Sequence, residues 1–119
     1  MTPNEYQKEA LRTEQTREKP VYEIKTEARR RLLNGLMGLN GESGEAIDLF
    51  KKYLFQGHKF DRVHLAKELG DVAWYLAISA DALGYTLEEI LQMNVEKLRA
   101  RYPDGFDSER SAHRKEGDL

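Results

Sequence analysis

The chain has 119 residues, of which 39% are hydrophobic and 34% are charged, and its formal net charge is −2. This length corresponds to one ordinary domain with a thin core, which favours association between copies. The near-neutral charge and the lack of a long basic run argue against binding to nucleic acid. The absence of cysteine excludes disulfides, thiolate nucleophiles and Cys-ligated zinc. A polar N-terminal region and the lack of any apolar run of about 20 residues predict a cytoplasmic protein with no membrane span.

The N-terminal region has the signals of a helix start. Thr2 is a good N-cap, Pro3 suits the first helical position, and Glu5 completes a capping box. We expect this helix to fade near Arg17, because Pro20 disfavours helical geometry in the residue before it.

A second helical pattern begins at residues 22–25 and runs to about residue 53, with apolar side chains at helical spacing. Four glycines recur in it at three-residue intervals: Gly35, Gly38, Gly41 and Gly44. Each glycine costs roughly 0.5–1 kcal/mol relative to alanine inside a helix, so the stripe needs a reason. One interpretation is a break between residues 34 and 41 that divides the helix in two. The other is close approach of a second backbone or a ligand along the stripe.

The third predicted helix, from Arg62 to Leu83, is the most apolar of the chain. Asp61 is a suitable N-cap after the loop at residues 55–60, and Gly84 is typical of a helix end. The spacing predicts a broad buried face made of Val63, Ala66, Leu69, Val72, Ala73, Leu76, Ala77 and Ala80.

A fourth helix is predicted from a capping box at Thr86–Glu89 to Tyr102, where Pro103 stops it. No segment alternates as a strand would. The pattern therefore predicts a single all-α domain over residues 1–106, a bundle of four to five helices that forms oligomers. Residues 107–119 are rich in Ser, Arg, Lys, Glu and Gly, which predicts a mobile C-terminal tail.

Two pairs of acids are the strongest functional signal. Glu42 and Glu45 lie three residues apart in one predicted helix, and Glu68 and Asp71 do so in the next, so each pair shares a helix face. Antiparallel packing of the two helices would gather four carboxylates around one small cavity. Four like charges need cations, and oxygen ligands suit Mg²⁺ or Mn²⁺. An ordinary solvated face is the alternative, but the second pair lies in an apolar run where unpaired carboxylates are costly to bury.

A positively charged face follows on the fourth helix. Asn94, Lys97 and Arg101 are spaced by three and four residues and therefore align. An amide, an ammonium and a guanidinium in a row suit phosphate oxygens, although a solvent-facing stripe has the same pattern.

Other side chains near the acid pairs have two interpretations each. Lys51 and Lys52 are candidates for phosphate binding, and Asp48 with Lys52 also forms an ordinary i,i+4 pair. Trp74 or Tyr75 is a candidate for stacking on a nucleobase, although aromatic residues of this kind are more often part of a core.

The segments around these acids resemble a known family. Gly-Glu-Ser-Gly-Glu at 41–45, Lys51-Lys52, and Glu-Leu-Gly-Asp-Val-Ala-Trp-Tyr at 68–75 are similar to motifs of MazG-type nucleoside triphosphate pyrophosphohydrolases. The continuation Asn-x-x-Lys-Leu-x-x-Arg-Tyr-Pro at 94–103 and Gly-Phe at 105–106 resembles them as well. The similarity runs from about residue 36 to residue 106.

The resemblance implies a helical bundle in which Glu42, Glu45, Glu68 and Asp71 bind Mg²⁺. It further implies hydrolysis of a nucleoside triphosphate to the monophosphate and pyrophosphate, by dimers or tetramers whose subunit contacts complete the pocket. Many members have two adjacent glutamates at the start of the first motif, whereas this chain has Gly41 before Glu42. The general base is therefore unassigned.

Three alternative functions remain open at the level of sequence. The first is a narrower dUTP or dCTP hydrolase, because the sequence does not fix the shape of the base pocket. The second is a non-catalytic helical module whose apolar faces bind another helix. The third is hydrolysis of polyphosphate or nucleic acid by the same metal ions.

Overall fold

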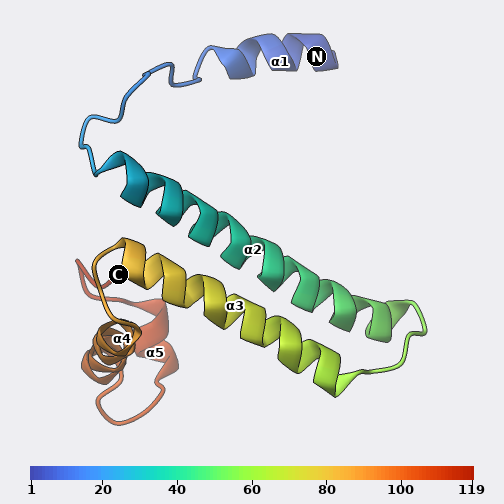
Figure 1. Ribbon diagram of the computed structural model, residues 1–119, viewed down its shortest axis with the longest axis vertical. Coiled ribbons are helices and arrows are strands. Elements are labelled where there is room, and N and C mark those ends of the chain that lie inside the picture. Colours follow the sequence, from blue (N-terminus) through green and yellow to red (C-terminus); the bar gives the residue numbers. More distant parts are fainter.

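The computed structural model describes residues 1–119 as an all-helical chain without strands, which confirms the predicted fold class (Figure 1). The helices in chain order are α1 (Pro3–Leu11), α2 (Thr26–Phe55), α3 (Arg62–Ala82), α4 (Leu87–Arg101) and α5 (Ser108–Ala112). None of them is long and apolar enough to cross a membrane.

The centre of the molecule is an antiparallel pair formed by α2 and α3 (Figure 1). A short loop reverses the chain between them, with Gly57 in the left-handed region at φ 70°. The Asp61 side chain then caps α3 by accepting a hydrogen bond of 2.9 Å from the backbone N–H of His64. The pair places the second half of α2 beside the first half of α3, where the two acidic motifs lie.

The glycine stripe does not break α2, which is one continuous helix of 30 residues. A Cβ atom at Gly35 would collide with the Ser79 hydroxyl, and one at Gly38 would collide with the Tyr75 ring. These two glycines therefore let α3 approach closely, as the second interpretation of the stripe predicts. Gly41 and Gly44 have no neighbouring atom within 4 Å of such a Cβ, so close approach explains only half of the stripe.

The chain turns again after α3, and α4 packs near the C-terminal end of that helix (Figure 1). Gly84 makes the turn with φ 82°, and the Thr86 hydroxyl caps α4 by accepting a hydrogen bond of 3.1 Å from the N–H of Glu89. The chain after α5 returns to α4, where Asp118 pairs with Arg101.

Helix α1 lies apart from the other helices (Figure 1). The predicted capping box is present at Thr2 and Glu5, but the helix ends at Leu11 and does not continue to Arg17. The Thr13 hydroxyl donates to the Ala10 carbonyl, a local bond that competes with helix continuation. Residues 12–17 also have no apolar face to pack, so their intrinsic helix propensity alone would have to keep them helical.

The single chain buries very little. Only Gly35, Ser79 and Ala80 are buried, and the radius of gyration is 19.8 Å. A compact chain of this length would have about 13–14 Å. The broad buried face predicted for α3 is wrong for the single chain, since Val63 is 66% and Leu69 57% exposed. Periodicity identified the apolar side of α3, but within one chain only α2 and one end of α4 cover it.

Candidate metal centre

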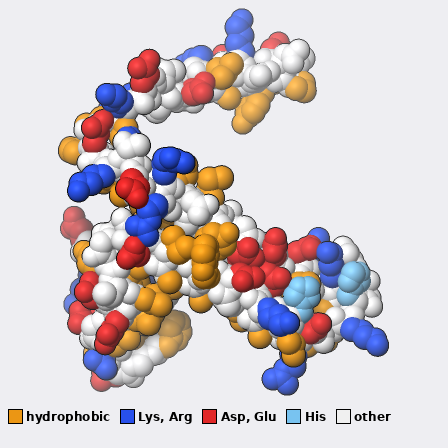
Figure 2. Space-filling view, viewed as in Figure 1, with side chains coloured by type: hydrophobic (Ala, Val, Ile, Leu, Met, Phe, Trp, Pro, Cys, Tyr) orange, Lys and Arg blue, Asp and Glu red, His pale blue; other side chains and the backbone are white.

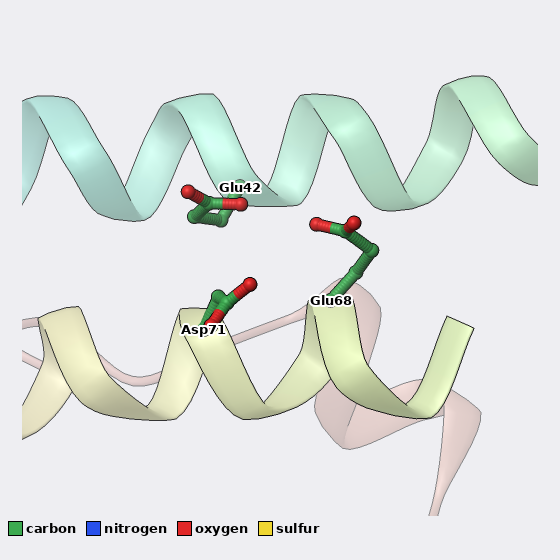
Figure 3. A group of neighbouring side chains, drawn as sticks. All are labelled: Glu42, Glu68 and Asp71. Atoms are coloured by element: carbon green, nitrogen blue, oxygen red, sulfur yellow. The ribbon is translucent and has the colours of Figure 1, made fainter. Parts of the chain in front are cut away.

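Three carboxylates meet between the central helices. Glu42 projects from α2 toward Glu68 and Asp71 of α3 (Figure 3). One oxygen from each of the three side chains lies within 4.8 Å of the others. The i,i+3 spacing of Glu68 and Asp71 puts both on the α3 face that meets α2. In the space-filling view the acidic side chains form a group on this helix pair, beside exposed hydrophobic side chains (Figure 2).

Two of the three side chains, Glu42 and Glu68, are partly withdrawn from solvent, whereas Asp71 is exposed. The Glu68 side chain is 14% exposed. Oε2 of Glu68 and Oε2 of Glu42 are both buried without a hydrogen-bond partner. Buried carboxylate oxygens without donors carry a desolvation penalty that a cation would relieve.

The surroundings of Glu42 disfavour its charged form. Burial is the main cause, and hydrogen bonding and negative charge from Glu45 come next, followed by Glu68 and Asp71. Together they raise the pKa of Glu42 from 4.5 to about 7. Burial combined with nearby like charges is a typical cause of raised carboxyl pKa values, and such shifts cluster at functional sites.

Glu45, the fourth predicted ligand, occupies a different position. It lies close enough to Glu42 to raise the pKa of that carboxyl, but it is exposed and lies outside the group of three converging carboxylates. The structure thus brings together three of the four acids of the two motifs. Their donor atoms are all oxygens, which fits a hard cation such as Mg²⁺ or Mn²⁺. The two orphaned buried oxygens fit the same kind of ion.

His64 is a neighbour of this group that the sequence analysis did not select. Its Nε2 atom lies 3.2 Å from Oε1 of Glu68, one helical turn away on α3. The i,i+4 spacing of His64 and Glu68 in the sequence predicts this contact. A ring nitrogen at this distance holds one oxygen of Glu68 and leaves the other directed to the group.

The other candidates on the central helices have ordinary partners. Lys51 and Lys52 both pair with Asp48, at 3.3 and 2.8 Å, and the Lys52 pair is the i,i+4 contact that the sequence predicts. Trp74 is 56% exposed and packs edge-on against Tyr75, with ring centroids 4.9 Å apart.

The positively charged face of α4 is separate from the acidic group in this chain. Asn94 and Lys97 are exposed, and Lys97 and Arg101 line a cavity to which no acid of the group contributes. The reason is topological. Helix α4 packs near the C-terminal end of α3, whereas Glu68 and Asp71 lie in its first half.

Comparisons with known proteins agree with the resemblance of the motifs. The profile of the MazG nucleotide pyrophosphohydrolase domain matches residues 31–106. The chain is also 40% identical over 73 residues to the "Gene 37 protein" of Mycobacterium phage L5. That match covers 58% of this chain and 64% of the phage protein, so the chain spans less than two thirds of its relative. No solved structure matches significantly. The domain match covers both acid pairs and more than half of the chain, and the chain therefore belongs to the MazG nucleotide pyrophosphohydrolase family.

Proposed function

We propose that this protein hydrolyses nucleoside triphosphates between the α- and β-phosphates, in a Mg²⁺-dependent reaction that releases the monophosphate and pyrophosphate. The observation that carries the proposal is the convergence of Glu42, Glu68 and Asp71 within 4.8 Å, with two buried oxygens lacking partners. The family assignment supports the reaction class. A cytoplasmic location would suit this substrate.

The acidic group is the proposed metal site. Glu42, Glu68 and Asp71 would hold the ion, and Glu45, which lies close enough to Glu42 to raise its pKa, is a further candidate ligand. A bound Mg²⁺ or Mn²⁺ supplies charge neutralisation for the phosphates and lowers the pKa of water. The protein's part is to place acceptor oxygens and to bury those of Glu42 and Glu68 in part, which strengthens their charge interactions.

Phosphate binding is assigned to the face of Asn94, Lys97 and Arg101. A guanidinium and an ammonium match phosphate oxygens, and the amide can orient them. Lys51 and Lys52 are secondary candidates, since contact with Asp48 already occupies them. The Trp74 ring is exposed beside the second acidic motif, as a stacking surface for a base requires.

We propose further that the protein acts as a homodimer or homotetramer. An apolar groove of about 340 Å³ runs along α2 and α3, with Ser43, Ile47 and Leu69 among its lining residues. Ser43 and Leu69 directly follow Glu42 and Glu68 in the sequence, so a second copy on the groove would lie next to the acidic group. Association could also bring α4 of one copy to the acidic group of another.

The direct test is incubation of the purified protein with a panel of ribo- and deoxyribonucleoside triphosphates and Mg²⁺, followed by chromatography of the products. Monophosphate and pyrophosphate are expected in equal amounts. Glu68→Gln and Asp71→Asn keep side-chain size and remove a charged ligand. Each should lower turnover at least about 100-fold, because even outer-shell partners of metal sites are worth 10–100-fold.

Glu88→Gln is the matched control, since Glu88 is exposed at the start of α4 and lies outside the acidic group. It should retain full activity. Diphosphate and phosphate as products would refute the bond assignment. Full activity in both the Glu68 and Asp71 variants would refute the metal site, and no product from any triphosphate would favour a non-catalytic helical module. The panel also shows whether dUTP or dCTP alone is accepted.

A further inference from the structure

A second charged site lies apart from the acidic group, between α4 and the chain that follows α5. It is a cavity of about 370 Å³ with one hydrophobic side chain in its lining. Its cationic side chains are Lys97, Arg101, Arg110, Arg114 and Lys115. Its only acids are Glu116 and Asp118. The lining therefore holds more positive charge than its own acids neutralise.

Arg101 is the most buried cation of this cavity. Its side chain is 10% exposed, and its guanidinium donates to both carboxylate oxygens of Asp118. The bonds are 2.9 Å from Nε to Oδ2 and 2.7 Å from Nη2 to Oδ1. Carboxylates and phosphates both fit this planar fork, so Asp118 occupies a position that suits a phosphate.

Several cations act on the same carboxylate. The pKa of Asp118 lies below its ordinary value, mainly through the hydrogen bonds from Arg101, with further contributions from the charges of Arg101, Arg114 and Lys97. The same three basic side chains, from α4 and from the chain after α5, line one cavity together with Asp118. A single aspartate brings one negative charge to this position, whereas pyrophosphate or a triphosphate chain brings several.

We propose that this cavity binds an oligophosphate anion and that Asp118 is an internal competitor, which must leave Arg101 when the anion enters. Arg110, Arg114 and Lys115 were not among the substrate contacts proposed above. For Lys97 and Arg101, the inference rests on the phosphate-binding role already proposed. Free pyrophosphate and the phosphate chain of a nucleotide share this chemistry. The Arg101–Asp118 pair then holds the C-terminal segment against α4 until an anion binds to Arg101 in place of Asp118.

The test is isothermal titration calorimetry of the whole chain with inorganic tripolyphosphate, at low salt and in excess EDTA. Without metal there is no hydrolysis and no ion at the acidic group, so the result is independent of the catalytic proposal. Asp118→Asn should bind at least about tenfold more tightly than the unmodified chain, because the competing charge is gone. Arg101→Gln and Arg114→Gln should each bind about tenfold more weakly, as expected for loss of a charged hydrogen bond.

Two variants control for net charge alone. Asp104→Asn removes an acid from the exposed turn after α4, and Arg17→Gln removes a cation from the segment before α2. Both should bind as the unmodified chain does. Circular dichroism checks each fold, and Arg114→Gln keeps the test valid if Arg101→Gln loses structure.

Equal affinities of Asp118→Asn and Asp104→Asn would overturn the role of Asp118 as competitor. No binding by any variant, or sulfate binding as tightly as tripolyphosphate, would overturn the site. Titrations with pyrophosphate and with a nucleoside triphosphate separate the two sources. If pyrophosphate and the nucleoside triphosphate bind with equal affinity, the ligand is the free oligophosphate. If the nucleoside triphosphate binds more tightly, the ligand is the phosphate chain of a nucleotide. Either result supports the cavity as an oligophosphate site.

Discussion

Glu42 on α2 and Glu68 on α3 face each other across the central helix pair, and each has one buried oxygen without a hydrogen-bond partner. Neither carboxylate can donate to the other while both are ionised. A shared proton relieves this conflict, and so would a cation. The pKa of Glu42 near 7 and the proposed metal site are therefore two consequences of the same geometry.

The first prediction concerns the pH dependence of metal binding. Glu42 holds a proton up to about pH 7, and a metal ion must displace that proton to use the carboxylate. The affinity for Mn²⁺, measured by calorimetry, should therefore rise by up to about tenfold per pH unit below 7 and level off above it. Glu42→Gln should bind more weakly and lose most of this slope. An unchanged slope in that variant would place the titrating proton on another group.

The second prediction assigns a positioning role to His64. Its Nε2 atom holds one oxygen of Glu68 at 3.2 Å, so His64→Asn should lower Mn²⁺ affinity by about tenfold, in the range known for outer-shell partners. His113→Asn is a matched control, because His113 lies one helical turn from Glu109, as His64 does from Glu68, but is 80% exposed in the C-terminal segment. Equal affinities of the two variants would contradict the role of His64. Far-ultraviolet circular dichroism should show the same helix content in both.

The third prediction separates the two halves of the glycine stripe. Gly38→Ala should destabilise the fold by about 1–3 kcal/mol, because the new methyl group meets the Tyr75 ring across the helix interface. Gly41→Ala meets no atom and should stabilise α2 by roughly 0.5–1 kcal/mol. Urea denaturation of both variants gives the free energies of unfolding. Destabilisation by Gly41→Ala would indicate that a second copy packs on that half of the stripe.

The fourth prediction concerns the apolar groove on α2 and α3. Leu69 is 57% exposed in the single chain and lines the groove. Leu69→Lys should dissociate the oligomer, because burial of a leucine contributes about 1.5–3 kcal/mol and a symmetric interface buries it in each copy. Light scattering after size exclusion measures the mass. Leu11→Lys on α1, where Leu11 is also 57% exposed, should leave the mass unchanged. A monomeric unmodified protein would contradict the proposed assembly.

Local signals determined much of this molecule. The caps at Thr2, Asp61 and Thr86 are present as the sequence predicts, because an N-cap depends on residues within one helical turn. The i,i+3 spacing was likewise enough to place Glu68 and Asp71 on one face. The two acidic family motifs could be read from the sequence for the same reason, since each lies within a single helix.

Only the tertiary structure decided which groups from different elements meet. It joined Glu42 to Glu68 and Asp71 and left Glu45 outside their group, because the register of α2 against α3 is set by close approach at Gly35 and Gly38. It also paired Arg101 with Asp118, 17 residues apart, and no periodicity in the sequence indicates that contact. Helical spacing specifies which side of a helix is apolar or charged, whereas packing against other helices specifies what covers that side.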